Sequence, residues 1–176
     1  MFRQKIFFYL TIISFLNACA NVLIKPPSES RIIENIPFYA QSKNQCGPVS
    51  LAAVMNYHGV AVTPDEIAAE IFSKTAKGTL TLDMLIYASK KGLKVTQYSG
   101  SIEDIRTNIN AGKPLIVLVD YGFFYTQYHF MVVIGYSDSG VVVNSDVFQG
   151  QFIPIEKFIA LWQKTNYWTL LISKPD

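Results

Sequence analysis

The stretch Gln45-Cys46-Gly47-Pro48, followed by the apolar residues 49–55, decides how this chain folds. Glycine and proline mark a turn, and the small apolar residues after it favour a closely packed helix. Cys46 therefore lies where a helix begins. The free N–H groups and the positive dipole end of a helix N-terminus favour a thiolate, which predicts a lowered cysteine pKa. This position is typical of a nucleophilic thiol.

A cysteine followed far along the chain by a histidine is a pattern typical of a thiol nucleophile and its base. In this chain that histidine is His129. His129 opens a β-rich run before the turn at residues 137–140, and Asp146 follows the next run. In two antiparallel strands joined by that turn, residues far from the turn meet. We therefore expect Asp146 to orient His129. Gln41, which precedes Cys46 by five residues, is expected to stabilise an oxyanion together with the Cys46 backbone N–H.

The composition excludes several classes of protein. Half of the 176 residues are apolar and 16% are charged, which is typical of a folded domain rather than a disordered tail. A net charge of +2 without a basic stripe does not indicate nucleic-acid binding. The sequence has neither a zinc-type cysteine spacing nor a phosphate-binding glycine loop. No metal, cofactor or nucleic acid is therefore expected.

The N-terminus carries the pattern of an export signal. Arg3 and Lys5 precede an apolar segment at residues 6–16 that is too short to span a bilayer. The following Leu16-Asn17-Ala18-Cys19 resembles the lipobox of bacterial lipoproteins, in which acyl chains are attached to the cysteine. We expect a signal peptide at 1–18, a lipidated tether at 19–35 and one domain at 36–176. The alternative is an ordinary secretory signal or short anchor in which Cys19 is incidental.

Either alternative places the body outside the cytoplasm. With lipidation, we expect a protein anchored in the bacterial cell envelope, on its periplasmic or outer face. Lipidation of Cys19 would also leave Cys46 as the only thiol, without an intramolecular disulfide partner. An unpaired cysteine in an exported protein indicates reactivity.

Hydrophobic periodicity and turn residues predict helices first and an antiparallel sheet afterwards, which is an α+β domain. Thr63 with Glu66, and Ser101 with Asp104, are helix-start signals. Leu82, Leu85 and Ile86 share one face of the third helix. The expected helices are 48–58, 63–72, 81–91, 101–111 and 156–162. The expected strands or extended runs are 36–40, 94–98, 114–119, 130–136, 140–143, 151–153 and 168–172.

At its candidate site residues the chain resembles the papain-like family of bacteriocin-processing, double-glycine-leader peptidases. The resemblance covers residues 37–172 and includes Gln41, the turn at 45–48, His129-Phe130 with the following apolar run, Asp146 and the segment 158–162. It implies a papain-like fold that hydrolyses peptide bonds, commonly after paired glycines. It also implies that Cys46 is the nucleophile, His129 the base, Asp146 the orienting acid and Gln41 the oxyanion donor.

The chain departs from the family pattern at two places. The usual aspartate-proline after the strand is replaced by Asn144-Ser145-Asp146-Val147, so Asn144 is an alternative to Asp146 as the orienting residue. The usual glutamine lies six residues before the cysteine, whereas Gln41 is one residue nearer. We also expect a stand-alone form without the transporter domains of many relatives, which makes paired-glycine specificity the weakest implication.

Two functions from different classes follow. The first is an active thiol peptidase that cuts a peptide or protein in the envelope, and the retained Cys46 and His129 favour it. The second is a catalytically silent module that binds a peptide within an export or envelope assembly system. A transferase or amidase acting through the same thioester is a third possibility. The aromatic residues at 123–128 are expected either to line a substrate groove or to pack over the core.

Overall fold

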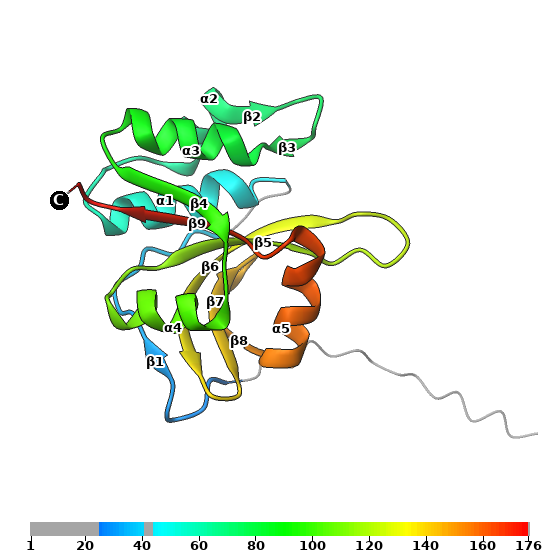
Figure 1. The fold of residues 1–176 in the computed structure, drawn as a ribbon. Coiled ribbons are helices and arrows are strands. Elements are labelled where there is room, and N and C mark those ends of the chain that lie inside the picture. Colours follow the sequence, from blue (N-terminus) through cyan, green and yellow to red (C-terminus); the bar gives the residue numbers. More distant parts are fainter. Residues whose placement is uncertain (1–24, 41–43, 176) are drawn as a thin grey trace, which may run out of the picture.

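The computed structural model describes residues 25–40 and 44–175. An antiparallel sheet with strand order β4-β9-β5-β6-β7-β8 forms its centre, and β1 pairs with β6 (Figure 1). The strands of this sheet are β1 (Arg31–Ile32), β4 (Lys94–Ser99), β5 (Leu115–Asp120), β6 (Tyr128–Ser137), β7 (Gly140–Ser145), β8 (Phe148–Pro154) and β9 (Trp168–Ser173). A separate small hairpin is formed by β2 (Phe72–Ser73) and β3 (Gly78–Thr79).

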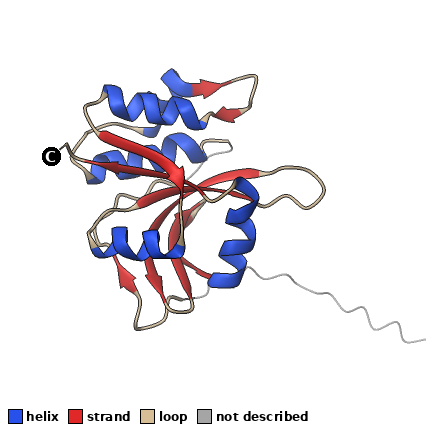
Figure 2. Cartoon of the chain, in the orientation of Figure 1, coloured by secondary structure: helices blue, strands red, loops and turns tan. Residues whose placement is uncertain are grey.

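Helices cover both faces of the sheet (Figure 2). They are α1 (Cys46–Tyr57), α2 (Pro64–Ile71), α3 (Thr81–Lys90), α4 (Ile102–Asn110) and α5 (Ile155–Trp162), with a 3₁₀ turn at η1 (Gln163–Thr165). Side chains of β6 alternate between the two faces, as the pleat of a strand requires. Phe130 and Val132 pack with residues of α1 and α3, whereas Met131 and Val133 pack with residues of α4 and α5.

Helix α1 is buried between α2, α3 and the sheet. Every residue from Gly47 to Met55 is buried, which explains why the helix is apolar all round rather than amphipathic. The small side chains of Ala52 and Ala53 let α1 lie close to β6, its main partner in the sheet. The first residue of this fixed helix is Cys46.

The α+β class and the order of the main elements were predicted correctly. The capping box of Thr63 and Glu66 is present, and the Ser101 side chain accepts a hydrogen bond from Asp104 N–H. The expected hairpin turn at residues 137–140 joins β6 to β7. Residues 36–40, expected as a short strand or extended run, do not form a strand, and the N-terminal segment that pairs with β6 is Arg31–Ile32. The packed part of the chain thus begins inside the expected tether 19–35.

The expected apolar face of α3 is only partly the buried one: Leu85 packs against the core, but Leu82 and Ile86 are exposed. Met84, Tyr87 and Ala88 are buried, while Leu82 is 60% and Ile86 is 39% exposed. The packing of α3 against α1 therefore selects a face that only partly overlaps the one with the larger aliphatic side chains.

The expected signal peptide 1–18 and the lipidation residue Cys19 lie outside the described residues. Within residues 25–40 and 44–175, no helix has the length and apolar character needed to cross a bilayer.

We expect Gly47→Ala to destabilise the protein, because a Cβ at Gly47 would lie 2.7 Å from Thr79 Cβ. Overpacking of this kind costs about 1–3 kcal/mol. The urea midpoint of unfolding should therefore fall. In a Thr79→Gly background, Gly47→Ala should lower the midpoint much less, because the side chain that the new Cβ would meet is gone. Equal losses in both backgrounds would show that α1 and β3 do not meet at this point.

Candidate active site

Cys46 occupies the first helical position of α1 and is partly buried. The residue before it, Gln45, makes no side-chain capping hydrogen bond to the helix. The backbone N–H groups of Phe130, Gly47 and Cys46 itself act on the sulfur of Cys46 and favour its thiolate form. The contact with Phe130 is informative because Phe130 follows His129 in β6. The start of α1 and the start of β6 therefore meet at the cysteine.

His129 is held near the start of β6, where it pairs with Val119 of β5, and it is only 9% exposed. Its ring nitrogen Nε2 lies 2.9 Å from Ser145 Oγ and 3.7 Å from Asp146 Oδ1. Ser145 is the last residue of β7, and Asp146 lies in the turn after it. The approach of Asp146 to His129 agrees with the prediction made from the hairpin turn. Both contacts use Nε2, so Nδ1 is the ring nitrogen left to act on a thiol.

Ser145 is the residue that sequence reasoning missed. Its Oγ also hydrogen-bonds the Tyr121 side chain, whose ring centroid is 5.7 Å from that of His129. Counting from the expected turn at 137–140 could not have found this residue, because the register shifts between Val133 and Gly135. Asn144 pairs with Val132, so the next residue, Ser145, shares a sheet face with Met131 and, by the period of two, with His129.

Asp146 lies beside this contact rather than within it. It has a left-handed backbone conformation with φ of 52°, and its side chain is 57% exposed. Its carboxylate is therefore partly screened by solvent, although it still acts on both Cys46 and His129.

Asn144, the alternative orienting residue, has a different task in the structure. Its side chain is buried, and its Oδ1 accepts a hydrogen bond of 2.9 Å from Gly150 N–H in the β7–β8 hairpin. Among the described residues, no hydrogen bond joins Asn144 to His129. The other expected site residue, Gln41, lies outside the described residues.

Burial dominates the electrostatics of the site. It raises the pKa of the Cys46 thiol, although the N–H groups of Phe130 and Gly47 favour the thiolate; Asp146 raises it further. The sequence-based expectation of a lowered cysteine pKa was therefore wrong, because desolvation outweighs the helix N-terminus. Burial also lowers the pKa of His129, against the opposing effect of Asp146. The resting pair is consequently a neutral thiol and a neutral imidazole.

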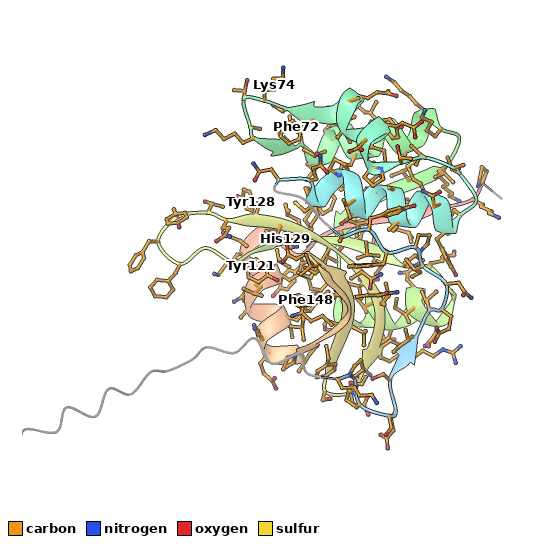
Figure 3. All side chains as sticks on the ribbon, turned by 180° about the vertical axis from the view of Figure 1, so that it is seen from behind. Phe72, Lys74, Tyr121, Tyr128, His129 and Phe148 are labelled. Atoms are coloured by element: carbon orange, nitrogen blue, oxygen red, sulfur yellow. The ribbon has the colours of Figure 1, made fainter. Side chains whose placement is uncertain are left out.

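Two hairpins border the site. Figure 3 shows Phe72 and Lys74 at the β2–β3 hairpin on one side, and Tyr121, Tyr128 and His129 at the β5–β6 hairpin on the other. Phe148, at the start of β8, lies near His129 in the same view. Of these aromatic side chains, that of Tyr121 lies against the imidazole, with 5.7 Å between the ring centroids. The described residues hold no cluster of His, Cys, Asp or Glu suited to a metal ion.

Comparison with solved structures supports the fold. A structure described as that of a C39-like peptidase from Bacillus anthracis matches with a TM-score of 0.70 at 20% identity, covering 84% of this chain and 99% of that one. The peptidase domain of Streptococcus ComA, a bi-functional ABC transporter involved in quorum sensing, matches at 0.66 and 18% identity, covering 80% and 100%. A double glycine motif protease from an AMS/PCAT transporter, in complex with the leader peptide, matches at 0.63 and 21% identity, covering 86% and 99%.

Sequence comparisons add two results. An uncharacterized protein from Methanothermobacter thermautotrophicus is 30% identical over 98 residues, which is 56% of this chain and 62% of that relative. The model of the Peptidase C39-like family matches residues 33–169, which include both Cys46 and His129. With its papain-like α+β fold and this match over most of its length, the chain belongs to the Peptidase C39-like family.

Proposed function

We propose that this protein is a thiol peptidase that hydrolyses peptide bonds through an acyl-enzyme on Cys46. One observation carries the proposal: the backbone N–H of Phe130 favours the thiolate of Cys46, and Phe130 directly follows His129 in β6. The Nε2 of His129 is in turn hydrogen-bonded to Ser145 Oγ. This arrangement leaves the Nδ1 of His129 for the thiol proton. A nucleophile, a base and a group that orients the base are the parts needed for covalent catalysis.

In the proposed reaction, His129 Nδ1 takes the proton of the Cys46 thiol as the sulfur attacks the carbonyl carbon of the peptide. The tetrahedral intermediate then loses its C–N bond, and His129 returns the proton to the leaving amine. Water attacks the remaining thioester and gives its proton to His129. Release of the carboxylic acid breaks the C–S bond and restores the thiol.

The remaining residues stabilise charge in these steps. Ser145 accepts the Nε2–H of His129 and fixes the ring, and the nearby Asp146 favours the imidazolium. The Cys46 N–H, at the open end of α1, and the Gln41 side chain are proposed to stabilise the oxyanion.

The cellular setting is also a proposal, and it rests on the sequence pattern. Export by residues 1–18 and lipidation of Cys19 would anchor the enzyme in the bacterial cell envelope. Its substrate would be a peptide or protein that reaches this surface, since a structural neighbour was solved with a leader peptide. An export or envelope assembly system would be its partner.

A silent peptide-binding module is the second candidate, and one observation favours it. The raised pKa of Cys46 and the lowered pKa of His129 oppose the thiolate–imidazolium pair in the resting protein. A module of this kind would keep the fold and bind a peptide without cutting it.

The decisive comparison is between cells carrying the wild type and cells carrying Cys46→Ala. We expect the wild type to generate a set of new protein N-termini that disappears with Cys46→Ala, because the acyl-enzyme cannot form without the sulfur. N-terminal proteomics measures this difference directly. Identical N-termini in both strains, with equal protein levels, would favour the silent module.

The pH dependence of Cys46 alkylation tests the base. In a Cys19→Ser chain, where Cys46 is the only thiol, iodoacetamide labelling near pH 7 should depend on transfer of the proton to neutral His129. Because burial raises the pKa of the Cys46 thiol above its ordinary value, His129→Ala should slow labelling at pH 7, and labelling should then increase only at alkaline pH.

The same assay distinguishes the contribution of Ser145 to orienting His129 from that of Asp146. Ser145→Ala should slow labelling at pH 7 about tenfold, the factor for a hydrogen bond to a charged group. Asp146→Asn should change it by no more than about fivefold, as for an exposed charge pair. A larger effect of Asp146→Asn would return the orienting role to Asp146.

Lipidation is tested in cells by incorporation of radiolabelled palmitate. The wild type should be labelled and should fractionate with membranes, whereas Cys19→Ser should not be labelled. A labelled Cys19→Ser protein would place the acyl group elsewhere, and an unlabelled wild type would favour the ordinary secretory signal.

A further inference from the structure

The loop between β5 and β6 carries a cluster of exposed aromatic side chains. Phe123 is 88%, Phe124 is 92% and Tyr125 is 79% exposed. The stretch from 121 to 128 contains no Asp, Glu, Lys or Arg. Single exposed apolar residues are ordinary, but a continuous uncharged aromatic cluster marks an interaction site. The expectation that this loop packs over the core is therefore not met at its tip.

Hydrogen bonds fix the base of this loop. Asp120 Oδ1 accepts from Gly122 N–H at 2.8 Å and from Gln127 N–H at 2.7 Å, and Lys164 Nζ donates to Gly122 O at 2.8 Å. The chain turns so tightly that a Cβ at Gly122 would overlap the carbonyl oxygen of Tyr125. The aromatic tip is therefore held outward by a closed loop, and it loses little conformational entropy when it binds.

A second hairpin on the same side supplies positive charge. Lys74 and Lys77 are exposed in the β2–β3 turn, and residues 72–82 contain no acidic residue. Both hairpins project from the same side of the molecule, to the right in Figure 1 and to the left in the reverse view of Figure 3. An uncharged aromatic tip and a dibasic turn thus lie on one side of the molecule, the side on which Figure 3 also shows His129 between the two hairpins.

This combination matches the chemistry of a bilayer surface. Aromatic side chains prefer the level of the lipid headgroups, and lysines are attracted to anionic headgroups. Peptides are bound in grooves or along exposed sheet edges, whereas this aromatic tip projects from the molecule, as side chains that insert at a bilayer interface do.

We propose that the β5–β6 and β2–β3 hairpins dock the protein onto an anionic phospholipid bilayer, with Phe123, Phe124 and Tyr125 inserted at the interface. Docking would turn the side of the molecule that carries the two hairpins toward the membrane surface. The contact is separate from the acyl anchor at Cys19 and does not depend on peptidase activity.

The test measures how deeply the β5–β6 loop inserts into the bilayer rather than whether the whole chain binds vesicles, because the N-terminal segment would itself associate with lipid. Full-length Phe124→Trp protein is mixed with phosphatidylglycerol–phosphatidylethanolamine vesicles whose acyl chains are brominated. The matched control is Thr107→Trp, an exposed position on α4. Emission of the wild type, from Trp162 and Trp168, is subtracted.

We expect the added emission of Phe124→Trp to shift to shorter wavelength and to be quenched by the brominated chains, whereas that of Thr107→Trp is unaffected. Lys74→Gln and Lys77→Gln should each weaken insertion about fivefold on these vesicles and have no effect on phosphatidylcholine vesicles. Unquenched Phe124→Trp emission in a protein that sediments with the vesicles would overturn the proposal. A shift caused by a soluble apolar peptide but not by vesicles would also overturn it and assign the loop to peptide binding. Circular dichroism establishes that each variant is folded.

Discussion

The packing of helix α1 against strand β6 is the contact on which the site depends. The helix is apolar around its whole circumference, so it is stable only when it is enclosed by the sheet and by α2 and α3. Enclosure fixes its first residue, Cys46, beside the N–H of Phe130, the residue that follows His129 in β6. Cys46 and His129 are 83 positions apart in the chain, and the packing of α1 against β6 brings the starts of their two elements together.

Burial has a cost for the chemistry that it makes possible. Desolvation raises the pKa of Cys46 and lowers that of His129, so charge separation is unfavourable before a substrate binds. At the sulfur this effect is opposed by three backbone N–H groups, those of Phe130, Gly47 and Cys46. At the imidazole it is opposed by the partly screened carboxylate of Asp146, which at the sulfur acts in the same direction as burial. A substrate carbonyl would reduce this cost further, because the sulfur that attacks it ends as a neutral thioester and does not remain a buried anion.

Local signals explain which predictions from the sequence were accurate. Turn residues, helix caps and periodicity depend on neighbouring residues, so the starts of α2 and α4 and the turn from β6 to β7 were correctly predicted. Features that depend on contacts with other elements were less accessible. The buried face of α3 is set by its packing against α1, and the pairing of Arg31–Ile32 with β6 was not expected.

The sequence by itself determined that a cysteine begins a buried helix, that a histidine begins a strand, and that a carboxylate follows the next strand, because each lies within a local pattern. Only the tertiary structure decided that Ser145 makes the shorter contact with His129, because strand register sets which side chains share a face. It also decided the direction of both pKa shifts and the exposure of the aromatic loop. Desolvation and solvent access are properties of the whole packed chain, and no single stretch of sequence contains them.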